Sequence, residues 1–208
     1  MLNYLFHVIA NVAFHLLCYV TNPIVVLFCD ERGNLPKIFT LWQTYDNCLD
    51  IEWMISEKIV PAIFRYDFNK HYKYHLEQKN NGVVIPGYVD IIDPVFTGKE
   101  KIQRYFCRLF WLYRNCAYGF SYYVSGRTVE FDKLVVVWKR GTEKKGDAQY
   151  LGVVDDKYGT FSFFREYAWC PFYYCRVYLG WKFKFAERSN TSDYRQLAYS
   201  ISPFRRYR

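Results

Sequence analysis

The chain has 208 residues, of which 51% are hydrophobic and 22% aromatic, and its formal net charge is +8. This apolar content excludes a disordered protein, because disordered chains lack the apolar surface that offsets the entropy of ordering. A charged fraction of 23% and a mean hydropathy of −0.19 exclude a polytopic membrane protein, and the length suits one ordinary domain or a small domain with an appended segment.

Charge and cysteine content indicate the kinds of partner and compartment. Residues 1–60 carry a net charge of −3, residues 61–128 carry +5 and residues 129–208 carry +6. Such a basic excess favours anionic partners such as nucleic acid, anionic lipid or an acidic protein surface, although it also serves solubility alone. The seven cysteines are odd in number and mostly lie in apolar surroundings, which favours a reducing compartment over a disulfide framework.

Residues 4–29 form an apolar run without Lys, Arg, Asp or Glu. The run is long enough to span a bilayer. A signal peptide is disfavoured, because no basic residue precedes the run and no small-residue cleavage site follows it.

Polar residues recur within this run at steps of three or four. They form one helical stripe, the polar stripe, which includes His7, Asn11 and His15 and continues through Cys18 and Asn22. The rest of the surface is apolar, and we expect five of its residues to contact a membrane or a partner: Leu5, Phe6, Ile9, Phe14 and Leu17.

Pro23 is expected to interrupt this helix, with Ile24–Phe28 as a second apolar piece before the polar turn at residues 30–34. A kinked hairpin in the membrane interface is one interpretation, and a buried helix pair of a soluble core is the other.

The middle of the chain mixes helices and loops. Residues 53–78 are expected to be helical in pieces broken at Pro61, and residues 79–98 to form a loop with a short extended piece at Val83–Ile85. On a helix, Asp67, His71 and His75 would share a face, but the HExxH arrangement is absent and zinc binding is disfavoured. Thr97 is expected to cap an amphipathic helix from Gly98 to Cys116, whose basic flanks suit either an anionic membrane or packing on a sheet.

The last third is predicted to be an antiparallel sheet. Strands are expected at Val129–Trp138, Tyr150–Val154, Tyr158–Arg165 and Phe172–Phe185, with a turn at residues 155–157 and a bend at Gly180. In the last of these, the odd-numbered positions from Cys175 to Phe185 are expected to face the core. The even-numbered positions would then form an outer basic face with Arg176, Lys182 and Lys184 beside tyrosines.

Exposed aromatics beside cations suit single-stranded nucleic acid, so this basic face is a candidate nucleic-acid contact. No RNP motif, zinc-finger spacing or GXXG loop supports it. The sequence also lacks P-loop, GxGxxG, GxSxG and HExxH motifs, so no catalytic residue, metal or cofactor is predicted. Asp90 and Asp93 are weak candidates for a metal or acid pair. Cys170 and Cys175 are a weak zinc signal without a second pair.

Two charged-plus-amide pairs lie among large aromatic residues. They are Asp46-Asn47 and Arg114-Asn115, and we call them the predicted polar latch. Because an unpaired buried charge is costly, we expect Asp46 to pair with Arg114, with a ligand site lined by the two as the functional alternative.

Three stretches carry a resemblance. They are Asn22-Pro23…Leu27-Phe28…Gly33…Leu35-Pro36…Trp42-x-Thr44-x-Asp46-Asn47, Arg114-Asn115…Ala117-Tyr118-Gly119-Phe120, and Gly180-Trp181-Lys182. The chain resembles an uncharacterised family of small accessory proteins encoded by tailed bacteriophages, over most of its length. The family has proline at the positions of Tyr45 and Cys116, where this chain departs from it. The resemblance implies a phage origin and expression inside a bacterium, and it implies no catalytic residues.

The sequence therefore predicts an α+β protein with an apolar helical segment at 1–34, a helix-and-loop region at 35–128 and an antiparallel β region with a basic tail at 129–208. The leading hypothesis is a non-enzymatic phage accessory protein that docks on a host protein or on the anionic cytoplasmic side of the host inner membrane. The alternatives are a cytoplasmic nucleic-acid-associated protein and a virion component. No small-molecule substrate is evident.

Overall fold

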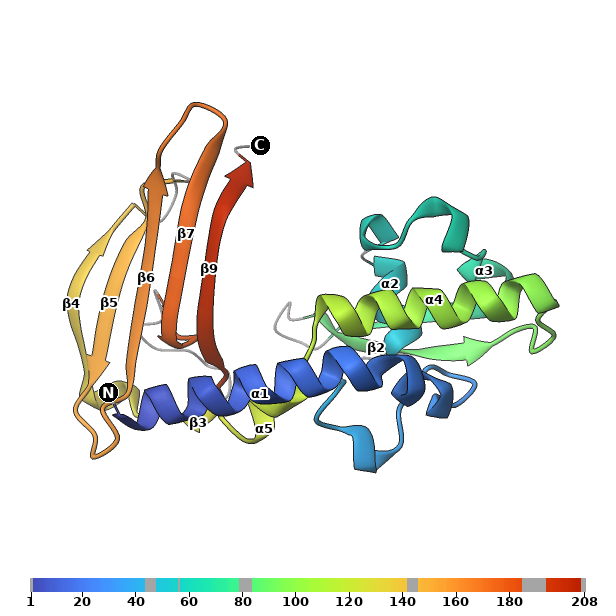
Figure 1. Cartoon of the computed structure of the whole chain (residues 1–208), viewed down its shortest axis with the longest axis horizontal. Helices are drawn as coiled ribbons and strands as arrows, with labels where there is room; N and C mark the ends of the chain where they lie inside the picture. The colour runs from blue at the N-terminus through green and yellow to red at the C-terminus, as the bar shows by residue number, and fades with distance from the viewer. Residues whose placement is uncertain are drawn as a thin grey trace. The chain divides into compact units, whose positions relative to one another are not determined.

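A computed structural model describes residues 2–43, 48–55, 57–78, 84–141, 146–184 and 194–206. The predicted α+β class is confirmed, with a long N-terminal helix, a helical middle and a five-stranded antiparallel sheet near the C-terminus (Figure 1). The chain forms two compact units. Unit 1 comprises Met1–Val12 and Ser121–Arg208, and unit 2 comprises Ala13–Phe120. The expected segment 1–34 is thus shared between the units.

Helix α1 runs from Leu2 to Val25 and is followed by the 3₁₀ turn η1, Val26–Phe28. The expected break at Pro23 is wrong, because α1 continues through this proline. A proline has no N–H to give to the carbonyl four residues earlier. Here that carbonyl, on Tyr19, accepts a hydrogen bond from the Tyr113 hydroxyl at 3.3 Å, and the Pro23 carbonyl accepts one from Tyr105 at 3.1 Å.

Unit 2 packs short elements around helix α4. After η2 (Lys37–Phe39) come α2 (Leu49–Ile55), η3 (Glu57–Ile59), η4 (Ala62–Phe64) and α3 (Phe68–His71). The antiparallel pair β1 (Tyr72–Gln78) and β2 (Val84–Ile91) then leads to α4, Gly98–Arg114. The core of this unit centres on Leu49, Ile51, Val60 and Leu112.

The start of α4 is confirmed. Thr97 accepts a hydrogen bond from the Glu100 backbone N–H while the Glu100 side chain accepts one from the Thr97 N–H, which completes a capping box. The helical expectation for residues 72–78 is wrong, because they form β1. The loop expected at residues 79–98 is also wrong in part, because β2 pairs with β1. His71 therefore ends a helix and His75 lies on a strand, so the two do not share a helical face.

Unit 1 is built on the sheet β4-β5-β6-β7-β9, in which every neighbouring pair is antiparallel. The short helix α5 (Tyr118–Tyr123), the paired strands β3 (Arg127–Thr128) and β8 (Tyr194–Arg195), and η5 (Phe131–Lys133) complete the described elements. The strands of the large sheet are β4 Leu134–Arg140, β5 Gln149–Val154, β6 Phe161–Ala168, β7 Tyr173–Trp181 and β9 Leu197–Arg206. Strand β9 has no counterpart among the sequence predictions.

The turn predicted at residues 155–157 is confirmed between β5 and β6. The Asp156 carboxylate accepts hydrogen bonds from the backbone N–H groups of Tyr158 and Thr160, at 2.9 and 3.0 Å. A short polar side chain that satisfies nearby backbone donors in this way is typical of turns.

Candidate membrane-contact site

Helix α1 places its polar residues toward the protein and its apolar residues toward the outside. Asn11, Cys18 and Asn22 are almost fully buried. Twelve large apolar side chains between Leu2 and Phe28 are exposed, among them Phe6 at 67%, Ile9 at 61% and Leu16 at 64%. This arrangement reverses the usual orientation of an amphipathic helix in a soluble protein, which buries its apolar stripe.

In unit 1, Ser125 contacts two residues of the polar stripe. The Asn11 amide donates to the Ser125 hydroxyl at 2.6 Å, and the same hydroxyl lies 3.2 Å from His7 Nδ1. Burial and the nearby Arg127 charge lower the pKa of His7, which favours its neutral form. Tyr4, near the start of α1, also packs within unit 1. Its hydroxyl donates a hydrogen bond to the Ala198 carbonyl, and its ring packs edge-on against Trp181.

In unit 2, two thiols continue the stripe. The Cys18 thiol hydrogen-bonds to that of Cys116, which also accepts a bond from the Asn22 amide at 3.7 Å. The Cys116 thiol donates to the His15 backbone carbonyl, and partial burial lowers the pKa of His15. Asn11, Cys18 and Asn22 are therefore buried, and His7 and His15 are partly buried.

Four of the five apolar residues predicted to face a membrane or partner are exposed: Leu5, Phe6, Ile9 and Leu17. The expectation for Phe14 is wrong. Its ring stacks on Phe120 with centroids 4.4 Å apart and packs edge-on against Trp42, so Phe14 is half-buried against the core of unit 2. We call the exposed apolar residues of α1 and η1 the α1 outer face.

The predicted polar latch falls partly outside the described residues. Asp46 and Asn47 lie outside the described residues. Arg114 is exposed in the last turn of α4, so it is not the buried partner that the prediction requires. The Asn115 amide donates a long hydrogen bond of 3.4 Å to the Trp111 carbonyl.

A buried ion pair does tie the region after α1 to α4, through residues that the sequence analysis missed. The Arg108 guanidinium donates to both carboxylate oxygens of Asp50, at 2.9 and 2.5 Å, and both side chains are at most 5% exposed. Tyr66 donates to the same carboxylate and Arg108 also reaches the Asp30 carbonyl, so each charge is well satisfied. Burial, and then the Asp50 charge, raise the pKa of Tyr66 well above its usual value. A charge inside an apolar run, as in Leu49-Asp50-Ile51 and Cys107-Arg108-Leu109, is the sequence signal that could have identified this pair.

The predicted basic face requires a correction. Phe164, which is 1% exposed, pairs with Tyr178 across the β6–β7 ladder, and buried Glu166 pairs with Arg176. Because residues opposite each other in a ladder share a face, Arg176 and Tyr178 lie on the core side of β7. The positive φ of +93° at Gly180 then changes the alternation, so that Trp181 and Phe183 are also buried.

The three cations of that prediction are all engaged. Arg176 forms an ion pair with Glu166 at 2.6 Å. The Lys184 amine lies 3.6 Å from the centre of the Phe164 ring, and the exposed Lys182 donates to Gln196 at 2.6 Å. The three side chains therefore do not form one exposed cationic surface, which phosphate binding through them would require.

Metal binding has little support within the described residues. No group of three or more His, Cys, Asp or Glu side chains there could hold a metal ion. His71 is fully buried, stacks on Phe96 at 3.9 Å and lies 2.9 Å from the Asp93 carbonyl, as expected of a core histidine. Cys170 bonds to the backbone of Tyr173 within the β6–β7 connection.

The chain matches the family of unknown function DUF7338 over residues 1–208, and it belongs to that family. No curated protein and no solved structure matches it significantly.

Proposed function

We propose that this protein is a non-enzymatic docking protein that binds a membrane surface through the α1 outer face. The observation that carries the proposal is the reversed amphipathicity of α1. A half-exposed aliphatic or aromatic side chain gains about 1 kcal/mol when it leaves water, so the twelve exposed side chains offer on the order of 10 kcal/mol before the cost of immobilisation. Exposed apolar side chains gathered on one face of a helix are typical of a membrane or protein contact.

Length and composition alone do not distinguish a membrane helix from a core helix, because a core helix of a soluble protein can be equally long and apolar. Leu2–Phe28 is long and apolar enough to cross a bilayer, yet only 28% of its most apolar window is buried. A core helix of a soluble protein is mostly buried, so the exposure of α1 favours a contact with something outside the chain.

The contacts of α1 favour an orientation in the plane of the membrane over a transmembrane one. Within unit 1, Tyr4 and Asn11 bond to Ala198 and Ser125, and within unit 2, Asn22 bonds to Cys116. A spanning helix would draw these partners into the hydrocarbon region, where irregular backbone is costly. A helix that lies in the interface keeps its polar edge in the protein and immerses only its apolar edge.

The resemblance to phage accessory proteins would make this membrane the inner membrane of a bacterial host. A host protein with an apolar groove is the rival occupant of the same face. Nucleic acid is a weaker candidate, since Arg176 and Lys184 are engaged on the core side of the sheet.

Flotation of the full-length protein with lipid vesicles tests the proposal. The wild type is expected to float with the vesicles, and the triple variant Phe6→Ser, Ile9→Ser, Leu16→Ser is expected to remain at the bottom of the gradient. These side chains are exposed, so the variant should keep the wild-type circular dichroism spectrum. Deleting α1 is a poorer test, because the helix supplies core residues to both units.

A matched control changes three exposed isoleucines elsewhere, Ile55, Ile63 and Ile92, to serine. This control should float like the wild type. Wild-type protein that stays out of the vesicle fraction would overturn the proposal. If that protein is also monomeric and captures a host protein that the α1 variant does not, the docking-partner alternative replaces it.

A further inference from the structure

The five-stranded sheet, like α1, has apolar residues on the side that faces away from the core. Because Tyr150, Phe164 and Tyr174 are buried, the alternate positions of β5, β6 and β7 point to the other side, which we call the sheet outer face. It carries rows of aliphatic and aromatic residues that pair across the strands. Examples are Val135, Val153, Phe163, Tyr167, Val177 and Ile201.

An antiparallel sheet that is solvated on one side normally carries polar residues on that side. Here Val135 is 59% exposed and Ile201 is 66% exposed, whereas the ion pair between Glu166 and Arg176 lies on the core side. The apolar side chains thus face outward without a layer that covers them fully, which is expected of a docking surface.

Exposed aromatic residues extend this face at one end of the strands. Trp169 and Phe172 lie in the β6–β7 connection and Phe204 lies near the end of β9, and they are 54%, 73% and 68% exposed. The Trp169 and Phe204 rings pack edge to face, with centroids 5.4 Å apart. We call these three residues the aromatic tip.

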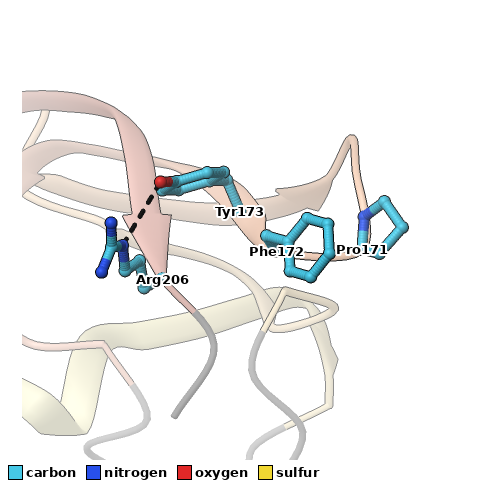
Figure 2. A pocket seen from close by; sticks show the side chains of 4 residues that line it. All are labelled: Pro171, Phe172, Tyr173 and Arg206. Carbon is cyan, nitrogen blue, oxygen red and sulfur yellow. Dashed lines mark hydrogen bonds between the residues drawn. The ribbon is translucent and has the colours of Figure 1, made fainter.

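A hollow of about 350 Å³ opens beside the tip, lined by Pro171, Phe172, Tyr173 and Arg206 (Figure 2). Figure 2 shows the Arg206 side chain reaching toward Tyr173, whose hydroxyl accepts a 3.3 Å hydrogen bond from Nε. The hollow therefore combines a guanidinium with apolar rings.

The charges on this face have one sign. Arg140, Arg165 and Arg206 occupy it, and no acidic residue takes an outward position in the described strands β4 to β7 and β9. Asp147, just before β5, lies 3.9 Å from Arg140 and offsets part of that charge. Arg165 lies over the Tyr167 ring, 4.4 Å from its centre. An anionic partner complements this pattern, whereas two copies placed face to face would bring like charges together.

The aliphatic content of the face distinguishes among anionic partners. Val135, Val177 and Ile201 can neither stack on bases nor form hydrogen bonds with them, so they offer little to a nucleic acid. They gain free energy by entering the acyl region of a bilayer, where tryptophan and tyrosine favour the headgroup level.

We propose that the sheet outer face, together with the aromatic tip, is a second bilayer contact that selects anionic phospholipids. This inference shares the membrane of the proposed function, but it depends on different residues and a different kind of lipid. Within unit 1, α1 meets the sheet through Phe161, Trp181 and Ala198, at the strand ends opposite the tip (Figure 1). Eight residues of strand place the two contacts about 25 Å apart, so together they would orient unit 1 on the surface.

Trp169 supplies a direct readout, because α1 contains no tryptophan. Full-length protein is mixed with vesicles of phosphatidylcholine alone, or with phosphatidylglycerol added, that carry brominated acyl chains. Bromine is expected to quench Trp169 in the anionic vesicles, together with Trp138, which pairs with Leu151 on the same face. Trp169→Phe is therefore expected to lose the Trp169 share of that quenching and to keep the Trp138 share. Of the other tryptophans, Trp53, Trp111 and Trp181 are buried and should be unaffected.

The charge requirement is tested with Arg165→Gln, Arg206→Gln. Each arginine near an anionic surface contributes about fivefold in affinity, so the double variant should bind phosphatidylglycerol vesicles about 25-fold more weakly. Its binding to neutral vesicles through α1 should be unchanged. Lys99→Gln, Lys101→Gln removes the same charge from exposed positions on α4 and should bind like the wild type.

The inference fails if Trp169 is not quenched while α1-dependent flotation persists, and that result leaves the proposed function intact. Equal loss in both double variants would show a net-charge effect and would also overturn it. Retention of single-stranded DNA that depends on Trp169 and Arg206, without lipid quenching, would assign the face to nucleic acid instead. A dimer in light scattering that Phe204→Ser dissociates would assign it to a second copy.

Discussion

The two long helices of this chain solve the same packing problem in opposite ways. Helix α4 exposes Lys99, Lys101 and Arg114 and buries Leu109, Trp111 and Leu112, as a helix of a soluble protein does. Helix α1 buries Asn11 and Asn22 and exposes its apolar residues. The period of a sequence thus shows that a helix has two faces, but the neighbours decide which face is inside. When the polar face is inside, the apolar face requires a partner beyond the chain.

The largest expected change in the free energy of unfolding follows from loss of the buried Arg108 charge of α4. Arg108→Leu leaves Asp50 buried without its partner, and removal of one member of a buried pair typically costs about 3–5 kcal/mol. The double variant Asp50→Leu, Arg108→Leu should lose less than the sum of the two single losses. Urea denaturation of the four proteins measures the coupling, and strictly additive losses would contradict a direct pair.

Smaller changes in stability are expected to distinguish the inner and outer faces of α1. Phe14→Ala should lower the free energy of unfolding by about 2 kcal/mol, below the 3–5 kcal/mol of a fully buried phenylalanine, because the Phe14 ring is half-buried against Phe120 and Trp42. Phe6→Ala should change stability by less than about 0.5 kcal/mol, as exposed positions do, yet weaken vesicle binding. Thermal melts and flotation of both variants test this, and a stability loss in Phe6→Ala equal to that in Phe14→Ala would refute the face assignment.

The sequence predicted the periodicities well and their orientation less well. The polar stripe, the capping box at Thr97 and the turn at Asp156 follow from local chemistry and are present in the structure. The expected face of β7 was inverted from Cys175 to Leu179, because Glu166 holds Arg176 on the core side, whereas Trp181 and Phe183 are buried as expected. The helix break at Pro23 was wrong, because a tyrosine distant in sequence satisfies the carbonyl that the proline leaves free. Such long-range contacts are not visible in local patterns.

The smallest expected effect is the pH dependence of the stability contribution of Lys184, on the core side of the sheet. Burial, and then repulsion from Arg176, lower the pKa of Lys184 to about 8, with Glu166 opposing the shift and Arg205 adding to it. Below pH 8, Lys184 is protonated in both the folded and the unfolded state. The folded state then bears the full free-energy cost of keeping this charge partly buried. Between pH 8 and the unfolded pKa near 10.5, the unfolded state binds more protons, so the contribution of Lys184 to stability rises with pH.

Lys184→Met should therefore stabilise the protein more at pH 7 than at pH 10. Comparison with the wild type at each pH cancels the titration of tyrosines and cysteines that both proteins share. Chemical denaturation at the two pH values measures the difference. A stabilisation that is the same at both would show that the Lys184 charge carries no cost in the fold.

The orientation of α1 is tested most directly by methyl NMR of the full-length protein on nanodiscs that contain spin-labelled lipid. The account predicts that the methyl signals of Ile9, Leu16 and Ile24 on the α1 outer face are broadened. Those of Val25, Val26 and Leu49, which are buried within unit 2, should be unaffected. Equal broadening of both sets, or none in the first set while the protein is bound to the nanodisc, would contradict a membrane contact through the apolar face of α1.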